Sequence, residues 1–174
     1  MNKPLSVTMF KPSDLGLSVV RFSMIQCGFN KIVMSKKSKF LSTPEGLYEV
    51  NEFYHSFLWI EDGIILGKYK PGLVIDLKVA KEAVNDRKKI SKGAIKPFLI
   101  DITELVSVDT HARKYLASAE ACEFLSAGAI YTHNKLLAFL GNAWILLDRP
   151  LIPVRVFTNK EAGLKWLGHF KYQN

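Results

Sequence analysis

Short apolar runs rich in β-branched and aromatic residues alternate with longer segments of helical spacing from about residue 57 to residue 167. Three segments between the last four runs are each long enough for a crossover helix, and a fourth helical segment follows. The pattern predicts an α/β fold with a four- to five-stranded mixed, mostly parallel sheet and about four helices. The predicted strands are residues 57–60, 64–69, 97–102, 127–133 and 152–158.

The first two runs predict an N-terminal hairpin. Asp62 and Gly63 lie between them, and this pair favours a tight turn because glycine tolerates a positive φ. Residues 54–60 and 64–69 should therefore pair as antiparallel strands. The remaining runs, each preceded by a helical segment, then add to the sheet in parallel.

Capping residues set the expected helix starts. Asp76 should cap a helix that runs to about Lys89, and a second helix should run from Asp109-Thr110 to about Phe124. Small residues at 126–128 should break the chain before the next strand, and a third helix should span 135–147. The spacing from Thr158 to Glu161 is that of a capping box, which predicts the start of a last helix. The residues expected to face inward are Leu77, Ala80, Ala83, Val84 and Arg87, then Tyr115, Leu116, Ala119 and Cys122, and finally Gly163, Trp166, Leu167 and Phe170.

The positive charge is concentrated in the N-terminal part of the chain. The 174 residues carry a net charge of +8, but seven basic residues and one acidic residue precede Glu45, so +6 of it lies there. We therefore divide the chain into a basic arm, residues 1–44, and a nearly neutral α/β domain, residues 45–174. The arm is interpreted as a solvated tail or as sequence upstream of a start at Met34, with weak contact to an anionic membrane surface as the alternative.

Nucleic acid is not an expected partner. A basic strip around the end of the first helix lacks the interleaved aromatic residues that nucleic-acid binding requires. The strip consists of Arg87, Lys88, Lys89, Lys92 and Lys96. We expect it to be a solvated helix end, where cations also suit the helix dipole.

The sequence of the chain also predicts a cytoplasmic protein. Arg21 interrupts the apolar segment 15–34, so the segment fits neither a membrane span nor a signal peptide. Two cysteines are too few for a disulfide framework, and Cys122 is expected to be a buried free thiol.

One loop contains most of the polar side chains that are candidates for a binding site. It leaves the predicted strand 97–102, and ligands of open parallel sheets meet the loops at the carboxyl ends of strands. We take six of its residues as candidates for binding a partner. They are Asp101, Thr103, Asp109, Thr110, His111 and Arg113.

The order of elements and this loop resemble the STAS/SEC14-like, or SpoIIAA-like, bacterial domains. The resemblance covers roughly residues 48–167. It rests on the hairpin and the helix–strand alternation. It also rests on Asp101-x-Thr103, Asp109-Thr110, and the strand 153–157 that leads to Ala162-x-x-x-Trp166-Leu167. It implies a SpoIIAA-like fold, with an N-terminal hairpin followed by β–α alternation, in an uncharacterised branch without an assigned activity.

The resemblance also implies a possible phosphorylation switch, but the matching motif is altered. In anti-anti-sigma members an Asp-Ser-Ser-Gly stretch opens the helix, and its second Ser is phosphorylated. Thr110 takes the first Ser position, whereas His111 stands at the second and Ala112 replaces Gly. Two hypotheses follow: Thr110 is phosphorylated in a switch controlled by a kinase, or Asp109 or Thr110 simply caps the helix.

No motif in the sequence supports enzymatic activity. The four histidines lack the spacing of zinc ligands, the glycines form no phosphate-binding fingerprint, and no nucleophile elbow is present. Asp101 could only serve a magnesium or phosphoacceptor site with further carboxylates, and Asp76 is already expected to cap a helix. We therefore expect no catalytic residue, no metal and no cofactor.

The third helix is apolar almost all round, so its second face should be covered by something. The candidates for this face are Leu136, Phe139, Leu140 and Trp144. The cover could be the N-terminal arm, a second copy of the chain, or an apolar ligand. We therefore expect a non-enzymatic module that binds a protein partner or a ligand, and a homodimer would fit. The alternatives are a carrier of an apolar, lipid-like ligand held in a pocket lined by Phe139 and Trp144, and the phospho-regulated switch.

Overall fold

The computed structural model describes residues 32–34, 39–43 and 46–171. The chain divides into two compact units, with the boundary after Val50. The described part of the first unit is an antiparallel meander of β1 (Ile32–Met34), β2 (Lys39–Thr43) and the residues of β3 (Gly46–Glu52) up to Val50. The rest of the predicted basic arm lies outside the described residues.

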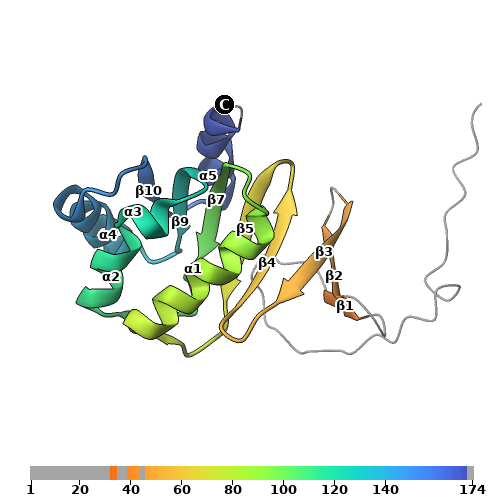
Figure 1. Cartoon of the computed structure of the whole chain (residues 1–174), viewed down its shortest axis with the longest axis horizontal. Helices are drawn as coiled ribbons and strands as arrows, with labels where there is room; N and C mark the ends of the chain where they lie inside the picture. Colours follow the sequence, from red (N-terminus) through yellow and green to blue (C-terminus); the bar gives the residue numbers. More distant parts are fainter. Residues whose placement is uncertain (1–31, 35–38, 44–45, 172–174) are drawn as a thin grey trace, which may run out of the picture. The chain divides into compact units, whose positions relative to one another are not determined.

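The second unit contains the predicted sheet (Figure 1). Its strands lie in the order β4, β5, β7, β9, β10. β4 and β5 pair antiparallel, while β5–β7, β7–β9 and β9–β10 pair parallel, so the predicted mixed, mostly parallel sheet is confirmed. Within this unit, Asn51 and Glu52 pair antiparallel with Leu58 and Phe57 of β4. The bounds are β4 Ser56–Glu61, β5 Ile64–Tyr69, β7 Lys96–Asp101, β9 Leu125–Tyr131 and β10 Val154–Phe157.

The predicted hairpin turn is confirmed in its backbone geometry. Asp62 and Gly63 have φ values of 48° and 76°, the positive pair that a two-residue hairpin turn requires. Further along β5, Gly67 packs so closely that an added Cβ would lie 2.7 Å from Leu58 and 2.8 Å from Ile100. Glycine at this position therefore lets side chains of β4 and β7 meet across β5.

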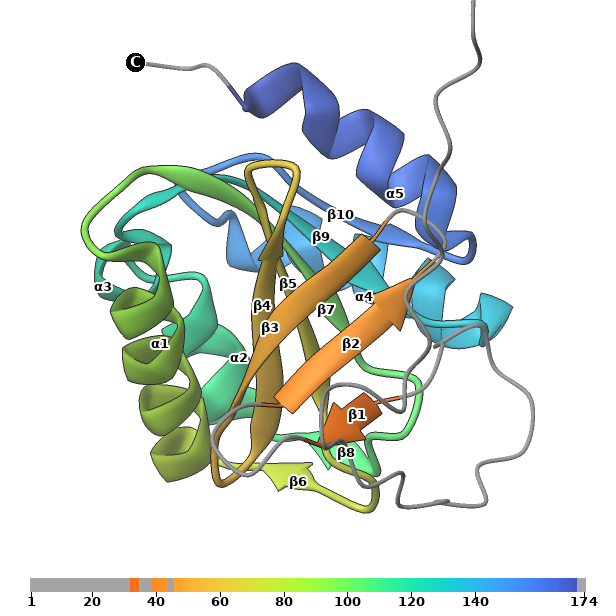
Figure 2. The same ribbon diagram turned by 90° about the vertical axis from the view of Figure 1, so that its right-hand side faces the viewer.

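Helices cover both faces of this sheet. They are α1 (Leu77–Ser91), α2 (Thr110–Leu116), α3 (Ala119–Cys122), α4 (Lys135–Asp148) and α5 (Lys160–Leu167), followed by the 3-10 turn η2 (Gly168–Phe170). Figure 2 shows α1 and α2 on one side of the strands and α5 on the other. Alternate residues of β7 follow this division, since Leu99 packs on Gly163 of α5 while Ile100 joins a buried cluster with Ala80 and Ala112. No helix within the described ranges is long and apolar enough to span a bilayer.

The second predicted helix is wrong in its extent, because it is two helices. α2 ends at Leu116, and Ser118 starts α3 by accepting a hydrogen bond on its Oγ from the Ala121 amide at 3.3 Å. A second N-cap within the segment therefore interrupts it. Cys122, at the end of α3, is a buried free thiol as predicted.

The predicted break at 126–128 is also wrong, because these residues lie inside β9. The chain turns earlier, at Phe124, whose φ is 59°. Ser126 and Ala127 are buried, and an added Cβ on Gly128 would lie 3.4 Å from Val154. Small residues here mark a closely packed central strand instead of a loop.

Asn159, and not Thr158, caps the last helix. Its Oδ1 accepts a hydrogen bond from the Ala162 amide at 2.7 Å. Asparagine ranks among the best N-cap residues and stands one residue closer to the helix, so it displaces the predicted capping box. The predicted inward face of α5 is confirmed, with Gly163 and Leu167 buried.

The sequence predicted none of β1, β2 and β3, and it also missed two short strands within the α/β part of the chain. β6 (Val74–Ile75) and β8 (Ser107–Val108) pair parallel and form a separate two-residue ladder. Runs of two residues carry no periodicity, so no sequence pattern identifies them. This ladder ties the loop after β5 to the loop after β7.

Candidate functional site

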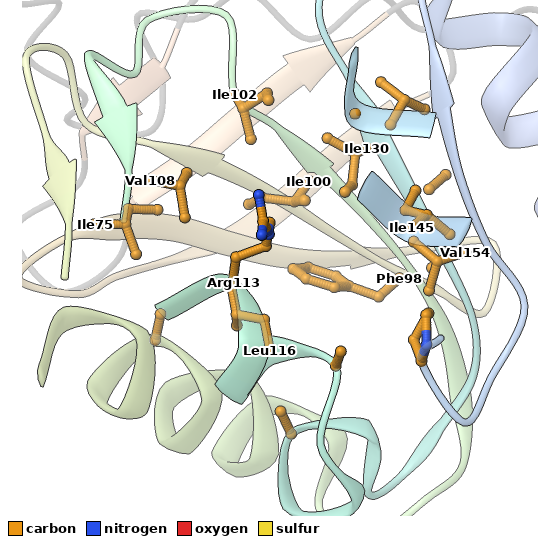
Figure 3. A pocket seen from close by; sticks show the side chains of 18 of the residues that line it. Ile75, Phe98, Ile100, Ile102, Val108, Arg113, Leu116, Ile130, Ile145 and Val154 are labelled. Carbon is orange, nitrogen blue, oxygen red and sulfur yellow. The ribbon is translucent and has the colours of Figure 1, made fainter. Parts of the chain in front are cut away.

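A cavity of about 420 Å³ lies on the sheet face that α1, α2 and α4 cover (Figure 3). Its walls are almost entirely aliphatic and aromatic. The floor comes from the sheet, through Phe98, Ile100, Ile130, Val154 and Val156, and the roof from Val84, Leu116, Leu137 and Ile145 of the helices. The volume and the apolar lining are typical of a small-molecule site.

α4 approaches the sheet closely at one point, and space remains beneath the rest of the helix. Ala138 is its only buried residue, and an added Cβ on Gly141 would lie 2.9 Å from Val156, so this is the point of close approach. Asn142 fixes the same point: its Oδ1 accepts from the Val156 amide at 3.0 Å and its Nδ2 donates to the Val156 carbonyl at 3.2 Å. β10 is the edge strand, so Asn142 satisfies backbone groups that no further strand pairs.

Arg113 is the polar group that projects into the cavity. In Figure 3 its side chain rises from α2 toward Ile100. The guanidinium carbon lies 5.0 Å from the ring centre of Trp144, and Nε lies 2.6 Å from Oδ2 of Asp148. Nε makes no well-aligned hydrogen bond there, so the contact is an ion pair. Trp144 and Asp148 both lie on α4, so their contacts with Arg113 join α2 to α4 across the cavity.

Arg87 contributes a second, deeper cation. It is 3% exposed, and its Nη2 donates to the carbonyl of Ala121 at 2.9 Å. Nη1 has no hydrogen-bond partner within the described part of the chain. Desolvation lowers the pKa of the Arg87 guanidinium. Its burial, with that of Ala80 and Val84, agrees with the predicted inward face of α1, whereas Leu77, also predicted to face inward, is exposed. The burial of Arg87 contradicts its place in the predicted solvated strip.

Tyr69 also lines the cavity. Burial raises the pKa of its phenol to about 12, although the nearby charge of Arg87 opposes the shift. Tyr69 therefore stays neutral at physiological pH and adds no charge to the lining.

The structure does not bring the predicted loop residues together. Asp101 is buried, and its Oδ1 accepts from the amide of Thr103 at 2.9 Å and from its hydroxyl at 2.7 Å, closing a local turn. Asp109 accepts from the Ala112 amide at 2.6 Å and caps α2. Both carboxylates therefore have structural partners close by in the sequence.

Thr110 and His111 lie at the exposed start of α2, outside the cavity. The hypothesis that Thr110 is phosphorylated stays a prediction. Of the six loop candidates, Arg113 alone lines the cavity.

The apolar candidates on α4 divide between two faces. Leu136 and Phe139 are 67% and 71% exposed and do not line the cavity, and Leu140 also faces outward. Trp144, 37% exposed, lies at the cavity wall. Leu137 and Ile145 line the cavity but were not among the candidates predicted from the sequence. Their spacing of eight, with Gly141 midway, places them on one stripe of the helix.

The sequence profile of the DUF7793 family, a domain of unknown function, matches residues 58–171. The chain belongs to the DUF7793 family. The matched residues run from β4 to the end of η2 and include nearly all of the cavity lining. A search of curated proteins finds no match for this DUF7793 protein.

Among solved structures, the chain is similar to an uncharacterized protein of the DUF3478 family from Shewanella loihica PV-4, which has a SpoIIAA-like fold. The two share 18% identity with a TM-score of 0.45, over 69% of this chain and 91% of that one. The SpoIIAA-like order of elements expected from the sequence, a hairpin followed by β–α alternation, is the order observed. The expectation of a family without an assigned activity is likewise confirmed.

Proposed function

We propose that this protein is a non-enzymatic binding module that holds an apolar small molecule between its sheet and α4. The observation that carries the proposal is the apolar cavity of about 420 Å³. Native cores contain few voids larger than a water molecule, because each one forfeits dispersion contacts. A cavity of this size is therefore better explained by a ligand that fills it than by imperfect packing.

The lining favours a flexible hydrocarbon ligand. Side chains such as Phe98, Ile100 and Val154 offer dispersion contacts but no hydrogen bonds. Each methylene group that leaves water for such a site contributes about 0.8 kcal/mol. An acyl chain would therefore gain affinity with length until the cavity is filled.

The cavity has an opening through which such a ligand could enter. Val106, Val108 and Trp144 line it and are 67%, 39% and 37% exposed. The loop that carries the valines ends in the short β6–β8 ladder. Motion of this loop or of α4 would widen the entrance.

Filling the cavity with a side chain tests the proposal. Ile145→Trp places a bulky indole ring among the lining residues. Ile95→Trp makes the same change at an exposed residue outside the lining. Delipidated protein is titrated with dodecanol by calorimetry, and folding is checked by circular dichroism. We expect Ile145→Trp to weaken binding at least tenfold and Ile95→Trp to leave it unchanged. If neither wild type nor variants bind dodecanol, the proposal is wrong.

The outer face of α4 favours a second candidate function, the formation of a homodimer. Leu146 and Leu147 are 77% and 74% exposed, alongside Phe139 and Leu136 on the same helix. Contiguous exposed apolar side chains usually mark an interaction surface. The test is sedimentation of wild type against Phe139→Lys and Leu146→Lys, and monomers throughout would remove this candidate.

We further propose that the protein works in a reducing cytoplasm. The buried Cys122 is a free thiol, as is usual where thiols are kept reduced. Fractionation of the native cells followed by immunodetection tests this location.

A further inference from the structure

The cavity carries a net positive charge. Its lining contains two arginines, Arg87 and Arg113, and one carboxylate, Asp148. Since Tyr69 stays neutral, one positive charge is left without a compensating anion in the lining. A low-dielectric wall strengthens the field of such a charge, so the cavity favours a ligand that brings one negative charge.

Arg113 is placed to meet that charge. Only its Nε edge faces Asp148, and the described residues offer its terminal nitrogens no hydrogen bond. The ring of Trp144, 5.0 Å from the guanidinium carbon, and Asp148 together fix its orientation from α4. A guanidinium held in this way presents parallel N–H groups that match the two oxygens of a carboxylate.

The position of Arg113 also fits a head group at the entrance. Its side chain is 29% exposed, whereas Arg87 is 3% exposed and lies deep in the lining. A carboxylate at Arg113 therefore keeps part of its hydration, while the attached chain lies along Phe98, Ile100 and Val154.

Resting on the proposed function, we infer that the ligand is a single-chain amphiphile with one carboxylate, held by Arg113 at the mouth of the cavity. Arg113 thus selects the head group, and the aliphatic walls take the chain. A charge-assisted, bidentate contact of this kind should favour an anionic head group over a neutral one by about tenfold to a hundredfold.

Calorimetry with dodecanoate and dodecanol, which share one chain length, tests the inference. Wild type should bind dodecanoate at least tenfold more tightly. Arg113→Gln should lower the affinity for dodecanoate at least tenfold more than that for dodecanol, and so remove this preference. Lys114→Gln, which removes a positive charge from the next, exposed residue of α2, should keep the preference.

Asp148→Asn should change the affinity for dodecanoate in the opposite direction from Arg113→Gln. Asp148 is the one carboxylate among the described residues of the lining, so removing its charge makes the cavity more positive, and the affinity for dodecanoate should rise several-fold relative to that for dodecanol. If Arg113→Gln fails to fold, the preference of wild type and the effect of Asp148→Asn decide the question.

The outcomes separate the inference from the proposed function. Equal affinities for dodecanoate and dodecanol in wild type, or no response to Asp148→Asn, would overturn the role of Arg113 and leave the apolar site standing. Binding of neither ligand would overturn both.

Discussion

The two faces of the parallel sheet are packed in different ways. On one face Gly163 lets α5 approach until an added Cβ would lie 3.3 Å from Leu99 and 3.4 Å from Phe157, and Leu167 is completely buried. On the other face α4 makes its close approach at Gly141 and buries only Ala138, and a cavity lies beside it. The comparison suggests that the α5 face supplies stability and the α4 face supplies the binding site.

The largest expected difference between the faces is in the free energy of unfolding. Leu167→Ala removes a buried side chain from a packed face and should cost about 3 kcal/mol. Ile145→Ala removes a similar side chain from a cavity wall, where few contacts are lost, and should cost less than about 1 kcal/mol. Urea denaturation of both variants measures this, and equal losses would contradict the division of roles.

Ligand should act on the two faces unequally as well. Dodecanoate at a hundred times its dissociation constant should stabilise the folded protein by about 2.7 kcal/mol. Hydrogen exchange should slow in α4, which lines the site, more than in α5, which does not. Uniform protection of both helices would show that ligand stabilises the whole fold without ordering the α4 face.

The sequence predicted the packed elements better than the α4 face. Strand 64–69 and the cap at Asp76 agree with the structure, because apolar runs and capping spacings are local signals. The cavity depends on how far α4 stands off the sheet, which no local pattern records. Arg113 was a candidate, but its orientation is set by Trp144 and Asp148, more than thirty residues downstream.

The loop candidates show the other limit of prediction. Asp101 and Asp109 were chosen because carboxylates at a strand end suit a binding site, yet each accepts hydrogen bonds within three residues of itself. A short-range turn or cap and a ligand site use the same residue types. Only the three-dimensional arrangement separates them.

A smaller effect should follow from releasing α4 at its anchor. Asn142→Ala leaves the amide and carbonyl of Val156 on the edge strand without their partner, which should cost about 2 kcal/mol. Asn85→Ala, at an exposed position of α1, is the matched control and should change stability by less than about 0.5 kcal/mol. Faster exchange of α4 amides in the first variant alone would locate the loss, and unchanged exchange would show that Asn142 is not the anchor.

The smallest expected effect compares one glycine from each face. Gly168→Ala adds a methyl group where nothing lies within 4 Å, and its right-handed helical backbone suits alanine, so it should stabilise by about 0.5 kcal/mol. Gly141→Ala gains similar helix propensity, but its Cβ would lie 2.9 Å from a methyl group of Val156, whose β-branched side chain has little freedom to turn away. α4 must then shift outward, so this variant should be the less stable of the two by about 1 kcal/mol in urea denaturation. The shift would also enlarge the cavity, and a weaker affinity for dodecanol in Gly141→Ala would show that the seating of α4 at Gly141 sets the fit of the site. An unchanged affinity would mean that the cavity walls adapt when α4 shifts. The affinity for dodecanol would then depend more on the flexibility of the α4 face than on its shape.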